Sequence, residues 1–101
     1  MFNKVNKKYI YSIIDMYLSE KIDASTFCDE FYYSYDLELD HNCLNEIEKK
    51  VFSDLGEIVD RFSPFEKDLK EYPQFFVSEK DLKKSVSFSK GQLGDSFFLI
   101  V

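Results

Sequence analysis

The chain has 101 residues, the size of one compact domain, and its eleven Phe and seven Tyr can supply a hydrophobic core. Three Gly and two Pro are too few for a disordered or collagen-like polymer. Nineteen acidic against thirteen basic residues give a net charge of −6, which disfavours direct binding of nucleic acid and favours a basic protein as partner.

The first helix is predicted within residues 1–20. Its apolar residues recur at the spacing i, i+3, i+4, i+7 and i+8, which places them on one buried stripe. We expect this stripe to pack against the rest of the protein, and it consists of Ile10, Ile13, Ile14, Tyr17 and Leu18.

A second helix is predicted from Asp23, a good N-cap residue, to about Tyr35. Ile22 precedes the cap and can contact Phe27 as a hydrophobic staple. At 100° per residue Tyr33 projects away from the buried face, so we expect its side chain to be exposed. The predicted buried face consists of Ala24, Phe27, Cys28, Phe31 and Tyr35.

The longest predicted helix spans residues 44–62, where apolar residues repeat at three and four positions over about five turns. Gly56 within this helix indicates a close approach to another helix. The predicted buried stripe consists of Leu44, Ile47, Val51, Leu55, Ile58, Val59 and Phe62. The predicted outward positions are Glu46, Lys50, Ser53, Glu57 and Asp60.

A short helix and a final helix complete the predicted elements. Ser63 is predicted as the N-cap and Pro64 as the first residue of the short helix, which ends before Tyr72. Ser78 is predicted to cap the final helix, and Gly91 lies near its end. The buried face of that helix would hold Leu82, Val86 and Leu93.

No segment shows a convincing strand pattern. We therefore predict an all-α fold, an antiparallel up-and-down four-helix bundle. Residues 1–101 are expected to form a single helical domain, in which residues 95–101 are an apolar C-terminal tail.

The sequence contains no recognisable catalytic or cofactor motif. His41 and Cys43 supply at most two ligands, whereas a structural zinc site needs four. Cys28 lies on a predicted core face, where a free cysteine behaves as a small hydrophobe. No glycine-rich phosphate-binding motif is present. We therefore expect no cofactor, no metal site and no enzymatic activity.

Two cysteines are too few for a disulfide scaffold, and the N-terminus lacks the apolar core of a signal peptide. Both observations favour a reducing cytoplasm. Residues 97–101 are the only nearly unbroken apolar run, and they are far shorter than the roughly 20 residues that span a bilayer. We therefore expect no membrane anchor.

Negative charge is concentrated in the middle of the chain. Residues 15–60 hold thirteen acidic residues against three lysines, a net charge of −10, which is suited to steering a basic partner. Glu57 and Asp60 are three residues apart and point outward, and the following turn can bring Glu66 and Asp68 alongside them. Tyr33 is a candidate aromatic anchor. The alternative is that these residues only keep a small helical protein soluble.

Three segments resemble the family of the colicin D immunity protein. Residues 17–27 (YLSEKIDASTF) resemble the join between its first two helices. Residues 60–64 (DRFSP) are similar to the end of its third helix, and residues 77–82 (VSEKDL) to the entry to its fourth. The resemblance covers roughly residues 9–93.

This resemblance implies a four-helix antiparallel bundle that binds the basic nuclease domain of a bacterial toxin, a tRNA-cleaving ribonuclease, and blocks its RNA-cleaving site. Asp60 matches the acidic residue at the end of the family's third helix. Phe65 replaces an acidic residue of the family, a role that Glu66 can take. Relatives accompany both colicins and contact-dependent growth inhibition toxins, and the sequence leaves open which system applies.

The alternative function is a non-enzymatic adaptor or regulatory helix bundle that binds another basic protein. Composition does not distinguish this adaptor from an immunity protein. The oligomeric state, the identity of the toxin and its RNA target are also left open.

Overall fold

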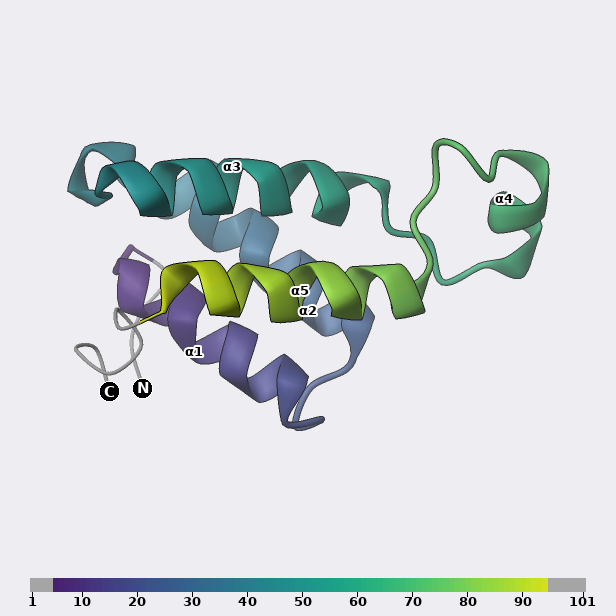
Figure 1. Cartoon of the computed structure of the whole chain (residues 1–101), viewed down its shortest axis with the longest axis horizontal. Coiled ribbons are helices and arrows are strands. Elements are labelled where there is room, and N and C mark those ends of the chain that lie inside the picture. The colour runs from purple at the N-terminus through teal and green to yellow at the C-terminus, as the bar shows by residue number, and fades with distance from the viewer. Residues whose placement is uncertain (1–4, 95–101) are drawn as a thin grey trace.

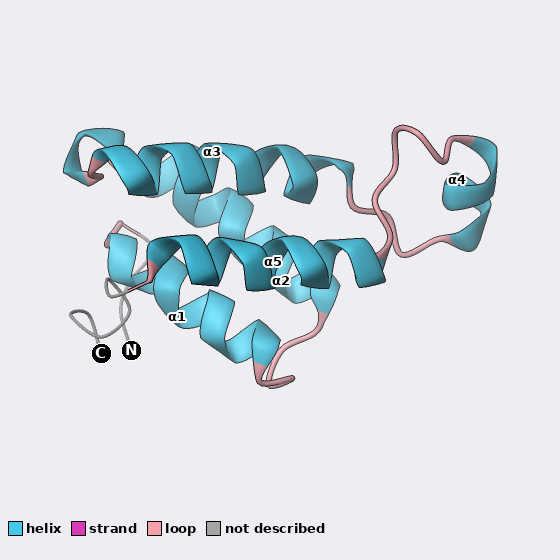
Figure 2. Cartoon of the chain, viewed as in Figure 1, coloured by secondary structure: helices cyan, strands magenta, loops and turns pink. Residues whose placement is uncertain are grey.

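The computed structural model describes residues 5–94, and in this part of the chain helices are joined by loops, with no strand (Figure 1, Figure 2). The predicted all-α class is confirmed. No helix in residues 5–94 is both long and apolar enough to cross a membrane. The predicted tail at residues 95–101 lies outside the described residues. The α-helices are α1 (Lys7–Leu18), α2 (Ala24–Phe31), α3 (Glu46–Arg61), α4 (Glu66–Glu71) and α5 (Glu79–Leu93), with a π-helix η1 (Tyr32–Glu38) and a 3-10 helix η2 (His41–Cys43).

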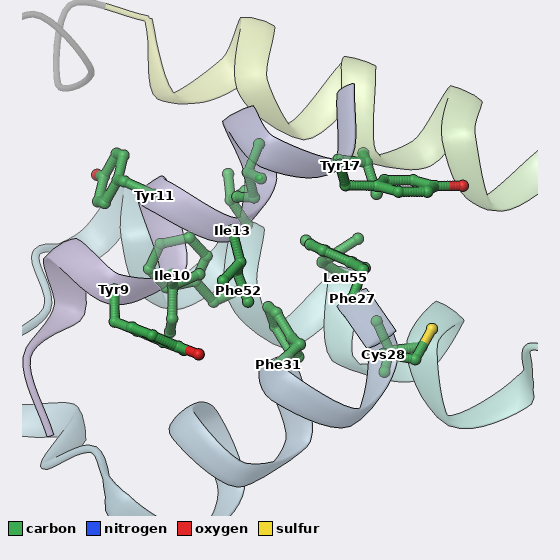
Figure 3. Packing of buried hydrophobic residues seen from close by; sticks show 14 of the residues in the cluster. Tyr9, Ile10, Tyr11, Ile13, Tyr17, Phe27, Cys28, Phe31, Phe52 and Leu55 are labelled. Atoms are coloured by element: carbon green, nitrogen blue, oxygen red, sulfur yellow. The ribbon is translucent and has the colours of Figure 1, made fainter. Parts of the chain in front are cut away.

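Four helices surround one hydrophobic core: α3 and α5 lie side by side, and α1 and α2 pack against them (Figure 1). Aromatic rings fill much of the core. The Tyr17 and Phe27 rings stack with centroids 5.0 Å apart, and Tyr11 meets Phe52 edge-on at 5.8 Å (Figure 3). Such aromatic pairs add about 0.5–1.5 kcal/mol each beyond the burial of their area. The first two helices are therefore fixed against each other and against α3.

Local signals placed two helix starts correctly. Asp23 caps α2 by accepting a hydrogen bond from the Thr26 backbone N–H at 2.8 Å, as predicted. Ser78 caps α5 by accepting from the Asp81 N–H at 3.2 Å, also as predicted. Each such cap contributes about 1 kcal/mol.

The predicted start of the short helix is wrong. Helix α4 begins at Glu66, after Phe65, and Pro64 lies outside it. The backbone N–H of Ser63 instead donates to the Val77 carbonyl at 3.1 Å, within an isolated parallel bridge between Phe62 and Val77. Because of this bridge the backbone stays extended after α3. Helix α4 therefore starts later than Pro64, its predicted first residue.

The second predicted helix also differs from the structure. Its α-helical part ends at Phe31, and the wider π-helix η1 continues to Glu38. Within η1 Ser34 is buried, whereas Tyr35, predicted on the buried face, is half-buried and packs against the Phe31 ring with centroids 5.3 Å apart. The prediction that Tyr33 is exposed is confirmed.

Gly56 lies where α3 meets the end of the second helical segment. A Cβ atom at Gly56 would lie 3.6 Å from the Tyr35 ring and 3.7 Å from the Phe31 ring. The predicted close approach at Gly56 is therefore confirmed. Those distances are ordinary van der Waals contacts, so an alanine would also fit.

The buried stripe of α3 contains an unexpected charge. Ile47, predicted to be buried, is 58% exposed, whereas Glu48 is 1% exposed and Phe52 is fully buried. Helix α3 begins with a capping box in which Asn45 and Glu48 bond each other's backbone N–H groups at 2.8 Å. This reciprocal cap turns Glu48 inward and leaves Ile47 outside.

Donors from α1 satisfy the buried carboxylate of Glu48. The Tyr11 hydroxyl donates to Oε2 at 2.5 Å, and Lys7 Nζ donates to Oε1 at 3.1 Å. Burial by itself raises the pKa of Glu48, but the hydrogen bonds from Tyr11, Asn45 and Lys7 and the Lys7 charge outweigh it and lower that pKa. Glu48 is therefore ionised in the fold and joins α3 to α1.

We predict that Glu48→Gln lowers the free energy of unfolding at pH 7 by roughly 1–3 kcal/mol, because an amide nitrogen then faces donors. The Glu48 pKa is lower in the fold than its ordinary value of 4.5. Its carboxylate therefore stabilises the fold above that value, and the contribution disappears as the pH falls through the folded pKa. Glu48→Gln should thus weaken the acid dependence of stability, measured by urea unfolding at a series of pH values.

Asp54→Asn is the matched control for this experiment. Asp54 pairs with Lys50 at 2.9 Å, but both side chains are exposed. Its removal should change the free energy of unfolding by less than about 1 kcal/mol. Equal losses in the two variants would contradict the role assigned to Glu48.

Candidate functional site

A hollow of about 320 Å³ lies between α2 and the C-terminal end of α3. Asp29 contributes a carboxylate from α2, and Asp60 contributes another from α3. None of the residues lining it is a Lys or Arg. We call this region the acidic hollow, and its lining consists of Ser25, Cys28, Asp29, Tyr32, Val59, Asp60, Phe62 and Pro64.

The Cys28 thiol forms part of the floor of the acidic hollow and is not a nucleophile. Cys28 is 9% exposed, which confirms the prediction that it belongs to the core. Burial, followed by the negative charges of Asp29 and Asp60, raises the pKa of Cys28 to about 12. The thiol therefore stays protonated at neutral pH, and the unreactive form is favoured.

Asp36 is a third carboxylate in this region, supplied by η1. Partial burial and the neighbouring charge of Asp60 raise the pKa of Asp36, while His41 acts in the opposite direction. The Asp36 carboxylate is thus close enough to Asp60 for the two charges to repel each other. Such an arrangement costs stability in the isolated protein and is suited to a cationic partner.

The structure brings some of the predicted site residues together. Asp60 lines the acidic hollow, and Glu57 is exposed one turn earlier on α3. Tyr33 is 49% exposed, and its ring meets that of Tyr32 edge-on at 5.7 Å. Since Tyr32 lines the hollow, the two tyrosines form an aromatic rim beside the carboxylates.

Glu66 and Asp68 occupy a different element, α4, which lies beyond the end of α3 (Figure 1). Glu66 is exposed and pairs with Lys70 at 3.3 Å. Asp68 accepts a hydrogen bond from the Ser63 hydroxyl at 2.7 Å. Neither residue lines the acidic hollow, so their joint action with Asp60 stays a prediction.

The described part of the chain offers no alternative centre for metal chemistry. Within residues 5–94 no group of three or more His, Cys, Asp or Glu side chains can hold a metal ion. His41 stacks on Tyr35 with ring centroids 4.3 Å apart, and its Nε2 lies 2.6 Å from the Tyr35 carbonyl oxygen. The role of His41 is therefore to pack the turn after η1.

Comparison with known families decides the identity. The model of the family of bacterial self-protective colicin-like immunity proteins matches residues 5–93. The chain belongs to this family. No curated protein and no solved structure matches the chain. The family implies that this immunity protein neutralises a cognate toxin, so the acidic hollow is a candidate toxin-binding surface.

Sequence reasoning missed two carboxylates near Asp60: Asp29, which lines the hollow, and Asp36 on η1. Neither residue was among the predicted toxin contacts. Their proximity to Asp60 arises from the packing of α2 and η1 on α3, since the residues lie 31 and 24 positions away from Asp60 along the chain. No local pattern encodes that contact; the only sequence signal was the regional excess of acid.

We predict that Asp36→Asn raises the stability of this immunity protein slightly at pH 7. A raised pKa means that ionised Asp36 is less favourable in the fold than in the unfolded chain, so its neutralisation removes a cost. Solvent screens the repulsion, so the gain should be within about 0.5 kcal/mol. It should vanish as the pH falls and Asp36 becomes protonated in both states. Urea unfolding near pH 7 and at a pH well below the ordinary Asp value of 3.8 tests this, and a loss of stability at pH 7 would contradict it.

Proposed function

We propose that this immunity protein neutralises a toxin that is a nuclease, by covering the basic active site of that nuclease with the acidic hollow and its rim. The carrying observation is the convergence of Asp29 and Asp60 on one hollow that no Lys or Arg lines. A tRNA-cleaving ribonuclease of the colicin D type is the proposed target. The proposed site of action is the cytoplasm, where that RNA lies.

The physical basis of the proposal is charge complementarity. A nuclease that cleaves RNA holds phosphates with Lys and Arg side chains, and carboxylates can occupy those cations without being cleaved. Repulsion among the carboxylates of the hollow would be relieved when cations approach them. The inhibition requires no chemistry from the immunity protein, so the proposal includes no enzymatic activity.

Each proposed contact has a defined role. Asp60 is placed at the centre, because it is near both Asp29 and Asp36. Glu57 extends the negative surface along α3, and Glu66 and Asp68 extend it onto α4. Tyr33 is proposed as an aromatic anchor on the rim, since exposed tyrosines are enriched among interface hot spots.

The proposal extends to the architecture. We propose that α1, α2, α3 and α5 form the antiparallel four-helix bundle of the colicin D type, with α4 as an additional short helix between the last two. Residues 1–101 then constitute one domain. This arrangement would present α2, η1 and the end of α3 together to the toxin.

The direct test is coexpression with the C-terminal domain of the cognate toxin, which is to be sought among the neighbouring genes. We expect the immunity protein to restore growth and to suppress RNA cleavage in extracts. Unchanged cell death and unchanged cleavage in the presence of soluble, folded protein would overturn the proposal. Protection from a domain that cleaves no nucleic acid would overturn its nuclease part.

Charge reversal tests the location of the site. We predict that the double variant Glu57→Lys, Asp60→Lys loses at least about tenfold in affinity, because like charges are then juxtaposed across the interface. Both residues are exposed, so folding should persist. Calorimetric titration with the toxin domain measures the affinity, and circular dichroism checks the fold.

The control for this variant is Glu46→Lys, Glu79→Lys, which changes the net charge equally. Both residues are exposed and lie in the first turns of α3 and α5, outside the acidic hollow. Glu20 is less suitable as a control because it pairs with Lys83 at 3.2 Å, whereas Glu46 approaches Lys49 only to 4.0 Å. Equal losses of affinity in both double variants would show that only the net charge matters and that the site is wrongly placed.

A further inference from the structure

The chain leaves the helical core between Phe62 and Val77 and returns beside its point of departure (Figure 1, Figure 2). Two backbone hydrogen bonds close this excursion: Val77 N–H donates to the Arg61 carbonyl at 2.7 Å, and Ser63 N–H donates to the Val77 carbonyl at 3.1 Å. We call residues 62–77 the arm. It includes α4 and projects beyond the ends of α3 and α5.

The arm displays large aromatic side chains to solvent. Phe65 is 66% exposed, Tyr72 is 59% exposed and Phe75 is 55% exposed. No residue of α4 is buried either. Phe76 contacts both Phe75 and Tyr72 edge-on, with ring centroids 4.9 and 6.2 Å apart. The rings of Tyr72, Phe75 and Phe76 form an apolar cluster after α4, and Phe65 adds an exposed ring directly before α4.

Several charges on the arm are engaged within the arm itself. Lys70 pairs with Glu66 at 3.3 Å, Lys67 approaches Glu71 at 4.0 Å, and Asp68 accepts a hydrogen bond from Ser63. The arm therefore offers a partner exposed aromatic side chains in addition to the carboxylates of Glu66 and Asp68. A hollow of about 490 Å³ at its tip is lined by residues 71–75 and can receive a side chain.

The arm is continuous with the acidic hollow. Phe62 and Pro64, at the start of the arm, also line that hollow beside Asp60. A protein bound at the hollow thus lies next to the base of the arm and within reach of its aromatic surface.

We propose that the arm is a second, apolar contact with the toxin domain, which packs against Phe65, Tyr72 and Phe75 while the acidic hollow engages its cations. This inference rests on the proposed function for the position of the toxin. The matching surface on the toxin is an apolar patch beside its basic site. Exposed aromatic side chains gain most when a partner desolvates them, which is why such residues dominate interface energetics.

The double variant Phe65→Ser, Phe75→Ser tests the arm, with the purified C-terminal domain of the cognate toxin as the probe. We expect a loss of affinity of about 30-fold, as for removal of an interface hot spot, seen mainly as faster dissociation. Thermal unfolding should change little because both side chains are exposed. Surface plasmon resonance separates the association and dissociation rates.

The matched control is Ile47→Ser, Phe88→Ser. These side chains are 58% and 68% exposed, and they lie on α3 and α5, outside both the arm and the acidic hollow. We expect the affinity of this control to stay within about threefold of that of the unaltered protein. Equal losses in the two double variants would overturn the inference, because exposed apolar area in general would then be responsible.

The remaining outcomes separate this inference from the proposed function. If the unaltered protein binds the toxin and the arm variant binds it equally well, the arm inference fails while the proposed function stands. If the unaltered protein does not bind the toxin, the proposed function is wrong, and the arm inference, which rests on it, is overturned as well. Light scattering is measured in parallel. If the unaltered protein is a dimer, the arm variant is a monomer and toxin binding is unchanged, then a second copy of this chain covers the arm. That result would overturn the inference.

Discussion

A buried carboxylate fixes how α3 lies in this protein. Glu48 is surrounded by the core, where an ionised group is tolerated only if hydrogen bonds and an opposite charge compensate for lost hydration. Tyr11 and Lys7 of α1 and the backbone N–H of Asn45 provide that compensation. Because these donors occupy fixed positions, α3 has one favourable rotation about its axis. That rotation buries Phe52 and directs Glu57 and Asp60 to solvent.

The candidate site follows from this rotation together with the aromatic packing around α2. Stacking of Tyr17 on Phe27 fixes α2 to α1, so Asp29 is carried to the last turn of α3. The π-helix then continues the chain far enough to bring Asp36 near Asp60. The surface at this corner therefore collects carboxylates, of which Asp36 and Asp60 repel each other. These carboxylates lower the stability of the fold but favour the binding of a cationic partner.

The sequence predicted the features that depend on interactions between residues close together along the chain. The spacing of Ile10, Ile13 and Ile14 predicted α1, and side-chain capping by Asp23 and Ser78 predicted the starts of α2 and α5. The hydropathy pattern placed Ile47, and not Glu48, in the buried stripe. It takes no account of the hydrogen-bond donors that α1 supplies to Glu48. The π-helix and the meeting of Asp29 with Asp60 were also unpredictable, since both depend on packing between segments distant in sequence. The family resemblance was confirmed by the match to residues 5–93, whereas the colicin D type was not tested.

The parallel bridge at Phe62 and Val77 has a consequence for how such a protein can change over generations. Its hydrogen bonds use backbone atoms, so no particular side chain is needed to close the excursion. When a surface segment whose ends are held together becomes longer, the entropic cost of closing it rises only slightly, by roughly 0.6 kcal/mol for each doubling of its length. Substitutions and insertions between residues 64 and 76 therefore leave the helical core undisturbed. The bridge thus separates the packed helices from a segment whose sequence can change without loss of the core, so new binding preferences can arise there without a new fold.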